Sequence, residues 1–536
     1  MNKYMLEKSS KIWLWISLTV LTFILSVRVD SRISLVSLTI GVGLAACIWG
    51  WMIFHKKYAF SVGEKDIFTV MALIGSIIWL RCDLEFFLSK SLVFNIIHID
   101  RILYVRIMAL ILFVVAFYGA FVLINSLVRT VADGIRYFIK TSDKIEIVYL
   151  ILWSVLCAVV VFAVYSSTVV FYSPGKYNLL YTFDSNSIYN ANSFMLIGQK
   201  ENDIRQSLFG FFALPVSIPS YFLSIIFPFQ YAYAYFVQVL QDVLIGVGFI
   251  LIVRLIGLKK GRKIVALCSF SVMSSTWIFS LLIEQYIILV FWLIVSVYCI
   301  SNKIGNREFC AVAAVGTAPT NALALIWEIK NQKSLKDFVV YGVRSFAKYI
   351  MVMICLGQTG LVLSSYNNVA SLMNYSGNID LVNRLKQYLF FVRSCFIGPA
   401  STVTEWDAWE GGPVLRMNEV LGYSRVGIIL LILIFACWLI SNKGVYSNIC
   451  LTWVVFSLVL MVGMGYCAAT NDMFLFSYYF GWSFASLLLI GMDKIIKKKY
   501  VFESIVLTGI LVMLIYNIPY LIRVLDFAIT YYPLQM

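Results

Sequence analysis

The stretch from Gln199 to Phe229 reads QKENDIRQSLFGFFALPVSIPSYFLSIIFPF, and it decides how the chain is threaded through a membrane. A polar cluster opens the stretch, and an apolar run from Leu208 to Phe229 follows it. The run is long enough for a helix to cross a bilayer, which takes about 20 residues. Three prolines interrupt it (Pro215, Pro219 and Pro228), and proline breaks a helix because it removes a donor and clashes with the preceding turn. We therefore predict that this run lies at the interface or dips in and out of the membrane.

The whole chain has the composition of a membrane protein. Of its 536 residues, 61% are hydrophobic and only 13% are charged, whereas soluble domains carry about 25% charged residues. The first apolar run, 12–27, follows a basic N-terminus without a small-residue cleavage site, which predicts a retained signal anchor. The net charge of +15 does not indicate nucleic-acid binding here. In a membrane protein, excess Lys and Arg mark the cytoplasmic loops.

This charge rule predicts which loops lie outside the cell. Two apolar runs, 207–229 and 232–256, lie between the span at 146–172 and the basic cluster at 259–263. If both runs spanned, the basic cluster would fall outside, against the rule. We therefore place 173–231 outside. The run 309–327 has basic residues on both sides and a break at Pro319, which favours a re-entrant hairpin over a single full span.

The predicted fold is an all-α polytopic membrane protein with about 13 transmembrane helices and a cytoplasmic N-terminus. Four parts follow from the spans and loops: an N-terminal four-span addition (1–145), a core with the outer loop 173–231 (146–364), a second outer loop (365–424) and the C-terminal spans (425–536). The Cys residues are scattered without a CxxC pair, and there are two His residues. We therefore predict neither a disulfide framework nor a zinc site.

Asp184 is the first candidate catalytic residue, in a polar stretch of the outer loop that is rich in Asn and Tyr. A carboxylate there can act as a general base on an acceptor hydroxyl. A nearly dry interface would raise the pKa of the carboxyl towards neutrality, because burial disfavours the charged form. The alternative is a helix N-cap, a position that Asp favours.

The second candidate is the charged stretch from Lys200 to Arg205. Glu201 and Asp203 are two residues apart, so both point the same way in an extended loop. They can share a divalent cation through oxygen ligands, or hold an acceptor sugar. Lys200 and Arg205 can neutralise a phosphate group, which Arg binds in bidentate fashion. The alternative is a solvated charged turn.

Glu284 and the loop 365–424 complete the set of candidates. Glu284 is the only charged residue between Lys263 and Lys303, at a predicted outer turn, and ionisable groups at such places are often functional. A plain polar turn is the alternative. In the second loop, carboxylates alternate with Trp in a pattern that fits a carbohydrate-contact surface or an interfacial aromatic belt (Glu405, Trp406, Asp407, Trp409 and Glu410).

This pattern resembles the GT-C class of multi-spanning glycosyltransferases, in which a span leads into a long outer loop with an essential Asp and interfacial helices. The span 146–172, Asp184 and the run 207–229 occupy those places here. The stretch Glu201-Asn-Asp-Ile-Arg-Gln-Ser-Leu-Phe also resembles the acidic–Arg–His–Pro–Leu–Phe stretch of some bacterial members. Gln206-Ser207 replaces the His-Pro pair, which leaves the role of that His open. The resemblance covers 146–330.

The resemblance implies an inverting transfer of a sugar from a polyprenyl-phosphate carrier to a glycan, lipid or protein on the outer face of a bacterial inner membrane. Asp184 would be the base, and Arg205 with Lys200 would bind the carrier phosphate. Glu201, Asp203 or Glu284 would hold the acceptor or a divalent cation, and no other cofactor is expected. One alternative is an O-antigen or capsule polymerase that depends on Arg384, Arg393 and Arg416. The other is a transporter or flippase of lipid-linked sugars, which scarce mid-span charges disfavour.

Overall fold

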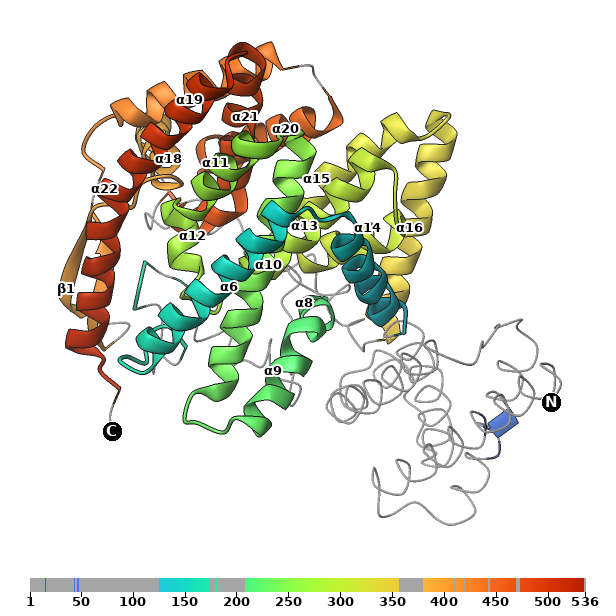
Figure 1. Cartoon of the computed structure of the whole chain (residues 1–536), viewed down its shortest axis with the longest axis horizontal. Coiled ribbons are helices and arrows are strands. Elements are labelled where there is room, and N and C mark those ends of the chain that lie inside the picture. The colour runs from blue at the N-terminus through green and yellow to red at the C-terminus, as the bar shows by residue number, and fades with distance from the viewer. Residues whose placement is uncertain are drawn as a thin grey trace. The chain divides into compact units, whose positions relative to one another are not determined.

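The computed structural model describes a mostly helical chain (Figure 1). The described residues are Trp15, Gly43, Ala46, Cys47 and the ranges 125–172, 179–181, 183, 208–355, 379–407, 411–418, 420–441, 444–468 and 473–534. The chain divides into two compact units. The first comprises 1–140, 196–200 and 347–364, and the second comprises 141–195, 201–346 and 365–536. In the first unit, residues 125–140 are helical, and Trp15 Nε1 donates a hydrogen bond to the Ala46 carbonyl at 2.8 Å.

The second unit is a bundle of apolar helices. Among the described residues, six helical stretches are long and apolar enough to cross a membrane. They are α6 (Lys144–Tyr165), α10 (Ala232–Ile256), α13 (Gln285–Asn302), α20 with its π-helical end η5 (Val445–Leu458 and Val459–Gly463), η6 with α21 (Met473–Phe476 and Ser477–Ile495) and α22 (Lys499–Tyr531). All six fall on predicted spans, so the protein is a helical membrane protein. The predicted spans before residue 125 lie outside the described ranges.

The proline-interrupted run forms a short helical arm. It contains α8 (Phe209–Phe212) and α9 (Leu214–Ile226), with Pro215 in the first turn of α9. Thirteen residues reach about 20 Å, less than the roughly 30 Å of a hydrocarbon core. Trp292 Nε1 donates to the Phe212 carbonyl at 3.1 Å, so α8 lies against α13 while α9 packs along α10. On its own, α9 is therefore shorter than a full span, and Pro219 lies inside it without ending the helix.

The segment after α13 turns back on itself. It comprises α14 (Arg307–Thr317), η2 (Pro319–Asn321), α15 (Ala322–Leu325) and η3 (Ile326–Asn331). Arg307 at its start forms an ion pair with Glu328 near its end. Asn331 Nδ2 donates to the Ile300 carbonyl at 2.8 Å. The two ends thus lie together, so the segment forms a hairpin, and α16 (Leu335–Cys355) follows.

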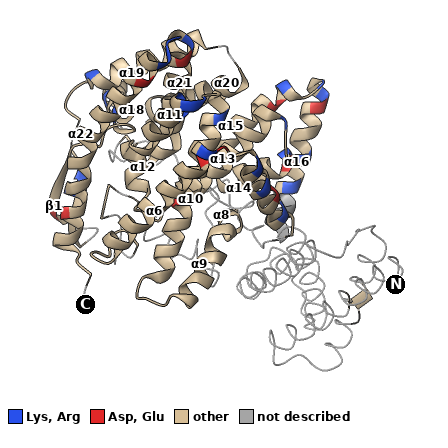
Figure 2. Ribbon diagram, viewed as in Figure 1, with Lys and Arg blue, Asp and Glu red and all other residues tan. Residues whose placement is uncertain are grey.

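The two ends of the α6–α10 pair differ in chemistry. At one end, which we call the charged end, Asp143 and Glu146 meet Arg254 and Lys263. At the other end, which we call the aromatic end, Tyr165, Tyr172 and Tyr231 lie together with ring centroids 4.8–6.4 Å apart. Figure 2 shows no charged residue on α9, which runs beside α10. Such an aromatic cluster is typical of a membrane–water interface.

The second predicted outer loop contains structure that corrects the all-α prediction. Its helix α18 (Leu381–Ser394) is followed by an antiparallel hairpin of β1 (Ser401–Asp407) and β2 (Gly412–Met417), and then by α19 (Arg425–Ile440). β-branched residues favour a strand in the sequence STVT of β1. Leu415 in β2 also exchanges backbone hydrogen bonds with Leu179 and Tyr181, both at 2.9 Å. The outer-loop residues before Asp184 are therefore tied to this hairpin.

One predicted span, 264–281, is broken into α11 (Lys260–Ser271) and α12 (Ser274–Phe279). Asn517 of α22 bridges the break. Its Nδ2 donates to the carbonyls of Val272 and Phe396 at 2.8 and 2.9 Å, and its Oδ1 accepts from Gly398 N at 2.8 Å. The side chain is fully buried. It therefore joins three segments that are more than 100 residues apart in sequence.

We expect Asn517→Leu to lower the free energy of unfolding by about 2–3 kcal/mol, because it leaves buried backbone groups without partners. Thermal or urea unfolding in detergent measures this change. The matched control is Asn302→Leu, since Asn302 is exposed and donates only to the Tyr298 carbonyl of its own helix. An Asn517→Leu variant as stable as this control would contradict the bridging role.

Candidate functional site

Of the predicted site residues, Glu284 lies within the part of the chain that the structure describes. Asp184, Lys200, Glu201, Asp203 and Arg205 lie outside the described residues. Glu284 sits at the predicted turn, as the N-cap of α13, where its carboxylate accepts a hydrogen bond from Gln285 N at 3.2 Å. Its exposed fraction is 0%, so the turn is buried inside the protein and does not face solvent.

Two glutamines of α10 hold the turn that contains Glu284. Gln238 Nε2 donates to the Phe279 carbonyl at 3.1 Å, and Gln241 Nε2 donates to the Glu284 carbonyl at 2.9 Å. The last carbonyl groups of a helix, among them that of Phe279 at the end of α12, have no partner within their own helix. In a membrane interior each unsatisfied group costs several kcal/mol. The glutamine amides therefore allow an irregular turn to exist at this depth.

Asp242 lies on the same face of α10, because residues at spacings of three and four share one helix face. Gln238, Gln241 and Asp242 are all fully buried. Asp242 is the eleventh residue of α10, about 15 Å from its first residue. Asp242 Oδ1 accepts from Gln238 Nε2 at 3.3 Å, while the Asp242 backbone carbonyl accepts from Trp153 Nε1 at 2.8 Å. A carboxyl group is thus held at the middle of a membrane span.

We call Gln238, Gln241, Asp242 and Glu284 the buried polar cluster. Among the described residues, no donor reaches Asp242 Oδ2, Gln238 Oε1 or Gln241 Oε1. Buried polar atoms normally have hydrogen-bond partners, and exceptions call for an explanation. Carbonyl and carboxylate oxygens that converge on one helix face suit a ligand rich in hydroxyl groups. The cluster therefore offers buried oxygen acceptors to a hydrogen-bond donor.

Aromatic rings border the cluster. The Phe279 ring stacks on Tyr478 with 5.3 Å between centroids and meets the Phe183 ring edge-on at 5.3 Å. Phe183 is the residue before Asp184 in the sequence. Tyr181 is also buried, and burial raises its pKa to about 12, so its phenol stays neutral. The described part of the first outer loop therefore packs on the segment that carries the buried polar cluster.

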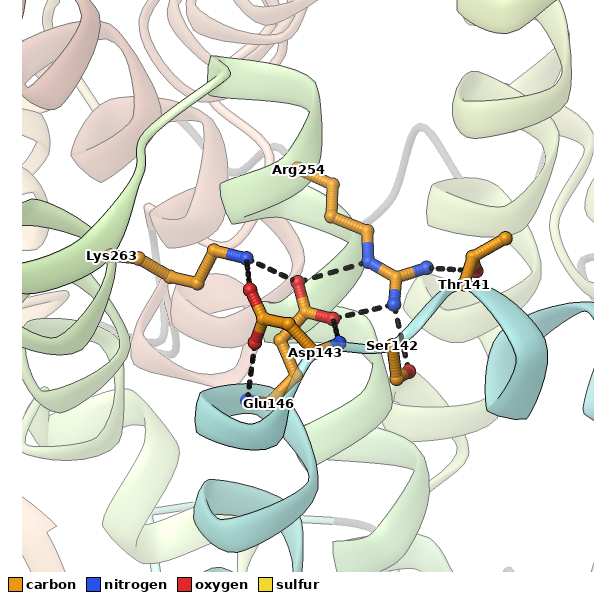
Figure 3. A network of polar contacts seen from close by, with 6 residues as sticks. All are labelled: Thr141, Ser142, Asp143, Glu146, Arg254 and Lys263. Carbon is orange, nitrogen blue, oxygen red and sulfur yellow. Dashed lines mark hydrogen bonds and ion pairs between the residues drawn. The ribbon is translucent and has the colours of Figure 1, made fainter.

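The charged end holds a second network, in which each charged side chain is paired with one of opposite charge (Figure 3). Glu146 accepts from Arg254 Nη2 at 2.6 Å and from Lys263 Nζ at 2.7 Å. Lys263 Nζ also donates to Asp143 Oδ2 at 2.6 Å. Asp143 and Glu146 form a capping box that begins α6. Two carboxylates balance two cations, so we interpret this network as a structural clamp between α6, α10 and α11.

The clamp keeps its groups charged. Burial acts to raise the pKa of Asp143, but hydrogen bonds from Lys263 and from the backbone N–H of Glu146 outweigh it and lower that pKa. Burial acts to lower the pKa of Lys263, but hydrogen bonds to Asp143 and Glu146 outweigh it and raise that pKa. The stabilisation from Asp143 is present above its unfolded pKa and is lost as the pH falls through the folded pKa. That from Lys263 is lost as the pH rises through the folded pKa.

No family model, curated protein or solved structure matches this chain. The function has to be argued from the site itself. Within the described ranges, no three His, Cys, Asp or Glu side chains are grouped so that they can hold a metal ion. Glu201 and Asp203, the predicted ligands of a divalent cation, lie outside those ranges.

The contacts given for three arginines of the second predicted outer loop are with other parts of the protein and not with the buried polar cluster. Arg384 Nη1 donates to the Gly463 carbonyl at 3.2 Å, and the Arg393 guanidinium lies 5.5 Å from the centre of the Phe390 ring. Arg416 pairs with Asp407 across the β hairpin at 2.6 Å. Arg416 is thus already neutralised by a carboxylate.

Sequence reasoning missed three members of the buried polar cluster, Gln238, Gln241 and Asp242. Their signal was a polar i, i+3, i+4 triplet within an apolar span, which places three hydrogen-bonding side chains on one face. Mid-span charges were expected to be scarce, with the ionisable groups at loops and span ends. Asp242, buried in the middle of α10, shows that this generalisation was wrong.

Proposed function

We propose that the protein is a membrane glycosyltransferase that moves a sugar from a polyprenyl-phosphate carrier to an envelope acceptor. The observation that carries the proposal is the buried polar cluster, which holds two carboxyl groups and open oxygen acceptors inside an apolar bundle. Intramembrane ionisable residues mark functional sites by default. Asp184 also follows Phe183 in the sequence, and the Phe183 ring packs on Phe279, whose carbonyl is bonded to Gln238 of the cluster.

The proposed reaction assigns one role to each residue. Asp184 takes the proton of the acceptor hydroxyl, whose oxygen attacks the anomeric carbon of the sugar as the bond to the carrier phosphate breaks. Arg205 and Lys200 neutralise the charge that develops on the leaving phosphate. Glu284 and Asp242 accept hydrogen bonds from sugar hydroxyls and orient them. Glu201 and Asp203 hold the acceptor or a divalent cation.

The proposal includes a GT-C-like architecture of about 13 spans in a bacterial inner membrane. The positive-inside rule supports a cytoplasmic charged end, because Lys259, Lys260, Arg262 and Lys263 lie there. The aromatic end and the β hairpin would then face outward. The short arm formed by α8 and α9 would be the interfacial element of the first outer loop.

Reconstitution tests the proposal directly. Purified protein in liposomes is supplied with a polyprenyl-phosphate-linked, radiolabelled sugar and with acceptor glycan or lipid from envelope extracts. We expect label to move to the acceptor and free polyprenyl phosphate to appear in equal amount. Release of carrier phosphate without glycosylated product, or no turnover of any lipid-linked sugar, would contradict transfer.

A transporter or flippase of lipid-linked sugars is the second candidate. The observation that favours it is the fully buried Asp242 at mid-span beside the broken pair α11 and α12. Discontinuous helices with polar groups near the midplane are common in transporters. The same liposomes separate the two functions. Transport moves the intact lipid-linked sugar between leaflets and leaves the sugar–phosphate bond unbroken.

We expect Asp242→Asn to lower the transfer rate about 10- to 100-fold, because the amide replaces one oxygen acceptor by an N–H donor and leaves a buried group unpaired, which costs about 1–3 kcal/mol. The substitution is nearly isosteric, so expression and detergent stability should stay close to wild type. Initial rates in the liposome assay measure the effect. The control is Asp526→Asn, since Asp526 is exposed on α22. Equal rates in the two variants would remove Asp242 from the site.

A further inference from the structure

Two of the described cysteines are in contact at the turn between α13 and α14. Cys299 lies in the last turn of α13 and Cys310 in the first turn of α14, and their Sγ atoms are 3.9 Å apart. The Cys310 carbonyl also accepts a hydrogen bond from Ser296 Oγ at 2.6 Å, which holds the two helices together at this point. Since a disulfide bond is about 2.05 Å long, both sulfurs are free thiols in this structure.

This cysteine pair lies close to water although both side chains are buried. Cys299 is 8% exposed and Cys310 is 2% exposed. Between them in the sequence, the turn at 302–306 is exposed except at Ile304, which is half-buried. Gly305 lies against the sulfur, since a Cβ added to it would be 3.4 Å from Cys299 Sγ, and it also lines a polar pocket of about 580 Å³. A small polar oxidant therefore has a short path to Cys299.

The cysteine pair lies toward the charged end of the bundle. Tyr298, which precedes Cys299 in α13, interacts with Arg254 of the clamp. The orientation proposed above places this end in the cytoplasm, where thiols are kept reduced and disulfides are transient or redox-sensing. A pair of thiols in this setting is suited to reversible oxidation and not to a permanent structural bond.

We propose that Cys299 and Cys310 form a redox-sensitive site, at which hydrogen peroxide joins them in a reversible disulfide. The Cys299 thiolate attacks a peroxide oxygen and the O–O bond breaks, which gives a sulfenic acid and a hydroxide that takes up the thiol proton as water. The Cys310 sulfur then attacks the sulfenic sulfur, whose S–O bond breaks. The leaving hydroxide takes the Cys310 proton. Two thiols and one peroxide thus give one disulfide and two waters, with the sulfurs oxidised and the peroxide oxygens reduced.

The disulfide would fasten α14 to α13. At its other end α14 contacts the short arm, because the Gly316 carbonyl accepts a hydrogen bond from Leu208 N at 2.9 Å. The redox site is separate from the proposed transfer chemistry. Cys299 is the fifteenth residue of α13, about 21 Å along the helix from Gln285, which follows Glu284 of the buried polar cluster.

Peptide mapping of the detergent-solubilised full chain tests the site. The protein is treated with hydrogen peroxide, its remaining thiols are alkylated, and it is digested with trypsin without reduction. Trypsin cleaves after Lys303 and Arg307, so Cys299 and Cys310 fall on separate peptides. After peroxide treatment we expect the two peptides as one linked species, two hydrogens lighter than their sum, which dithiothreitol separates. Protein without peroxide should yield both peptides alkylated.

Two variants complete the test. Cys310→Ser should abolish the linked species and leave a sulfenic acid on Cys299, which dimedone traps. The matched control is Cys450→Ser, since Cys450 is fully buried in α20, and it should form the linked species as the wild type does. If peroxide oxidises the exposed Cys268 but leaves Cys299 and Cys310 alkylated, the proposal is wrong. Linkage of Cys299 to other cysteines as often as to Cys310 would overturn it as well.

Discussion

Asp184→Asn will lower sugar transfer by about 10²- to 10⁴-fold, the contribution that a positioned general base makes to a reaction rate. The amide has nearly the shape of the carboxylate but cannot take the proton of the acceptor hydroxyl. Binding of the lipid-linked donor should change little, because the proposal assigns the carrier phosphate to Arg205 and Lys200. Transfer in liposomes, measured as initial rate against donor concentration, separates the two effects.

Asp526→Asn is the control for this variant as well, because it removes one carboxylate from the part of α22 nearest the aromatic end. Both variants must reach the membrane in wild-type amounts before their rates are compared. If correctly inserted Asp184→Asn supports full transfer, Asp184 is not the base. If transfer is lost but the intact carrier still moves between leaflets, the reaction and the transport step belong to the same protein.

Glu146→Ala will lower the free energy of unfolding by about 3–5 kcal/mol, the usual effect of removing one partner from a buried ion pair. Glu146 is 2% exposed and bridges Arg254 and Lys263. Its loss leaves Arg254 without its carboxylate partner and leaves Lys263 with Asp143 alone. Unfolding in detergent, followed by urea or by temperature, gives the difference from wild type.

Two further variants separate charge from packing at this clamp. Asp143→Ala should have a smaller effect, because the Asp143 side chain is 49% exposed and water replaces part of its contact. The triple variant Glu146→Leu/Arg254→Met/Lys263→Met removes the buried charges together and should recover most of the lost stability. A triple variant as unstable as Glu146→Ala would show that packing, not unpaired charge, causes the loss.

Hydrophobic runs predicted the described membrane helices well, because hydropathy acts over about 20 residues at a time. The break at Pro319 was also predictable, since proline acts on its own helix, whereas Pro219 lies inside α9 without ending it. The break between α11 and α12 carried no such signal. It is stabilised by Asn517 and by the carbonyls near Phe396, which are more than 100 residues away in sequence.

The candidate site was predicted only in part for the same reason. Glu284 stood out as a lone carboxylate at a turn, but its burial depends on contacts with Gln241 of α10. Asp242 was not recognised as a site residue from the sequence, because one acidic residue hardly alters the mean hydropathy of a 25-residue helix. The β hairpin was missed because a short strand pair in a loop depends on pairing between its strands and with Leu179 and Tyr181, far earlier in the sequence, and not on a long periodic pattern.

The clamp at the charged end also bears on the order in which the protein is made. Glu146 and Arg254 are 108 residues apart in sequence. At a synthesis rate of about 5–20 residues per second, roughly 5–20 seconds pass between the two. During that interval α6 has left the ribosome with a carboxylate whose final partner does not yet exist. The first helix of the second unit therefore reaches its final place only after α10 and the start of α11 have been translated.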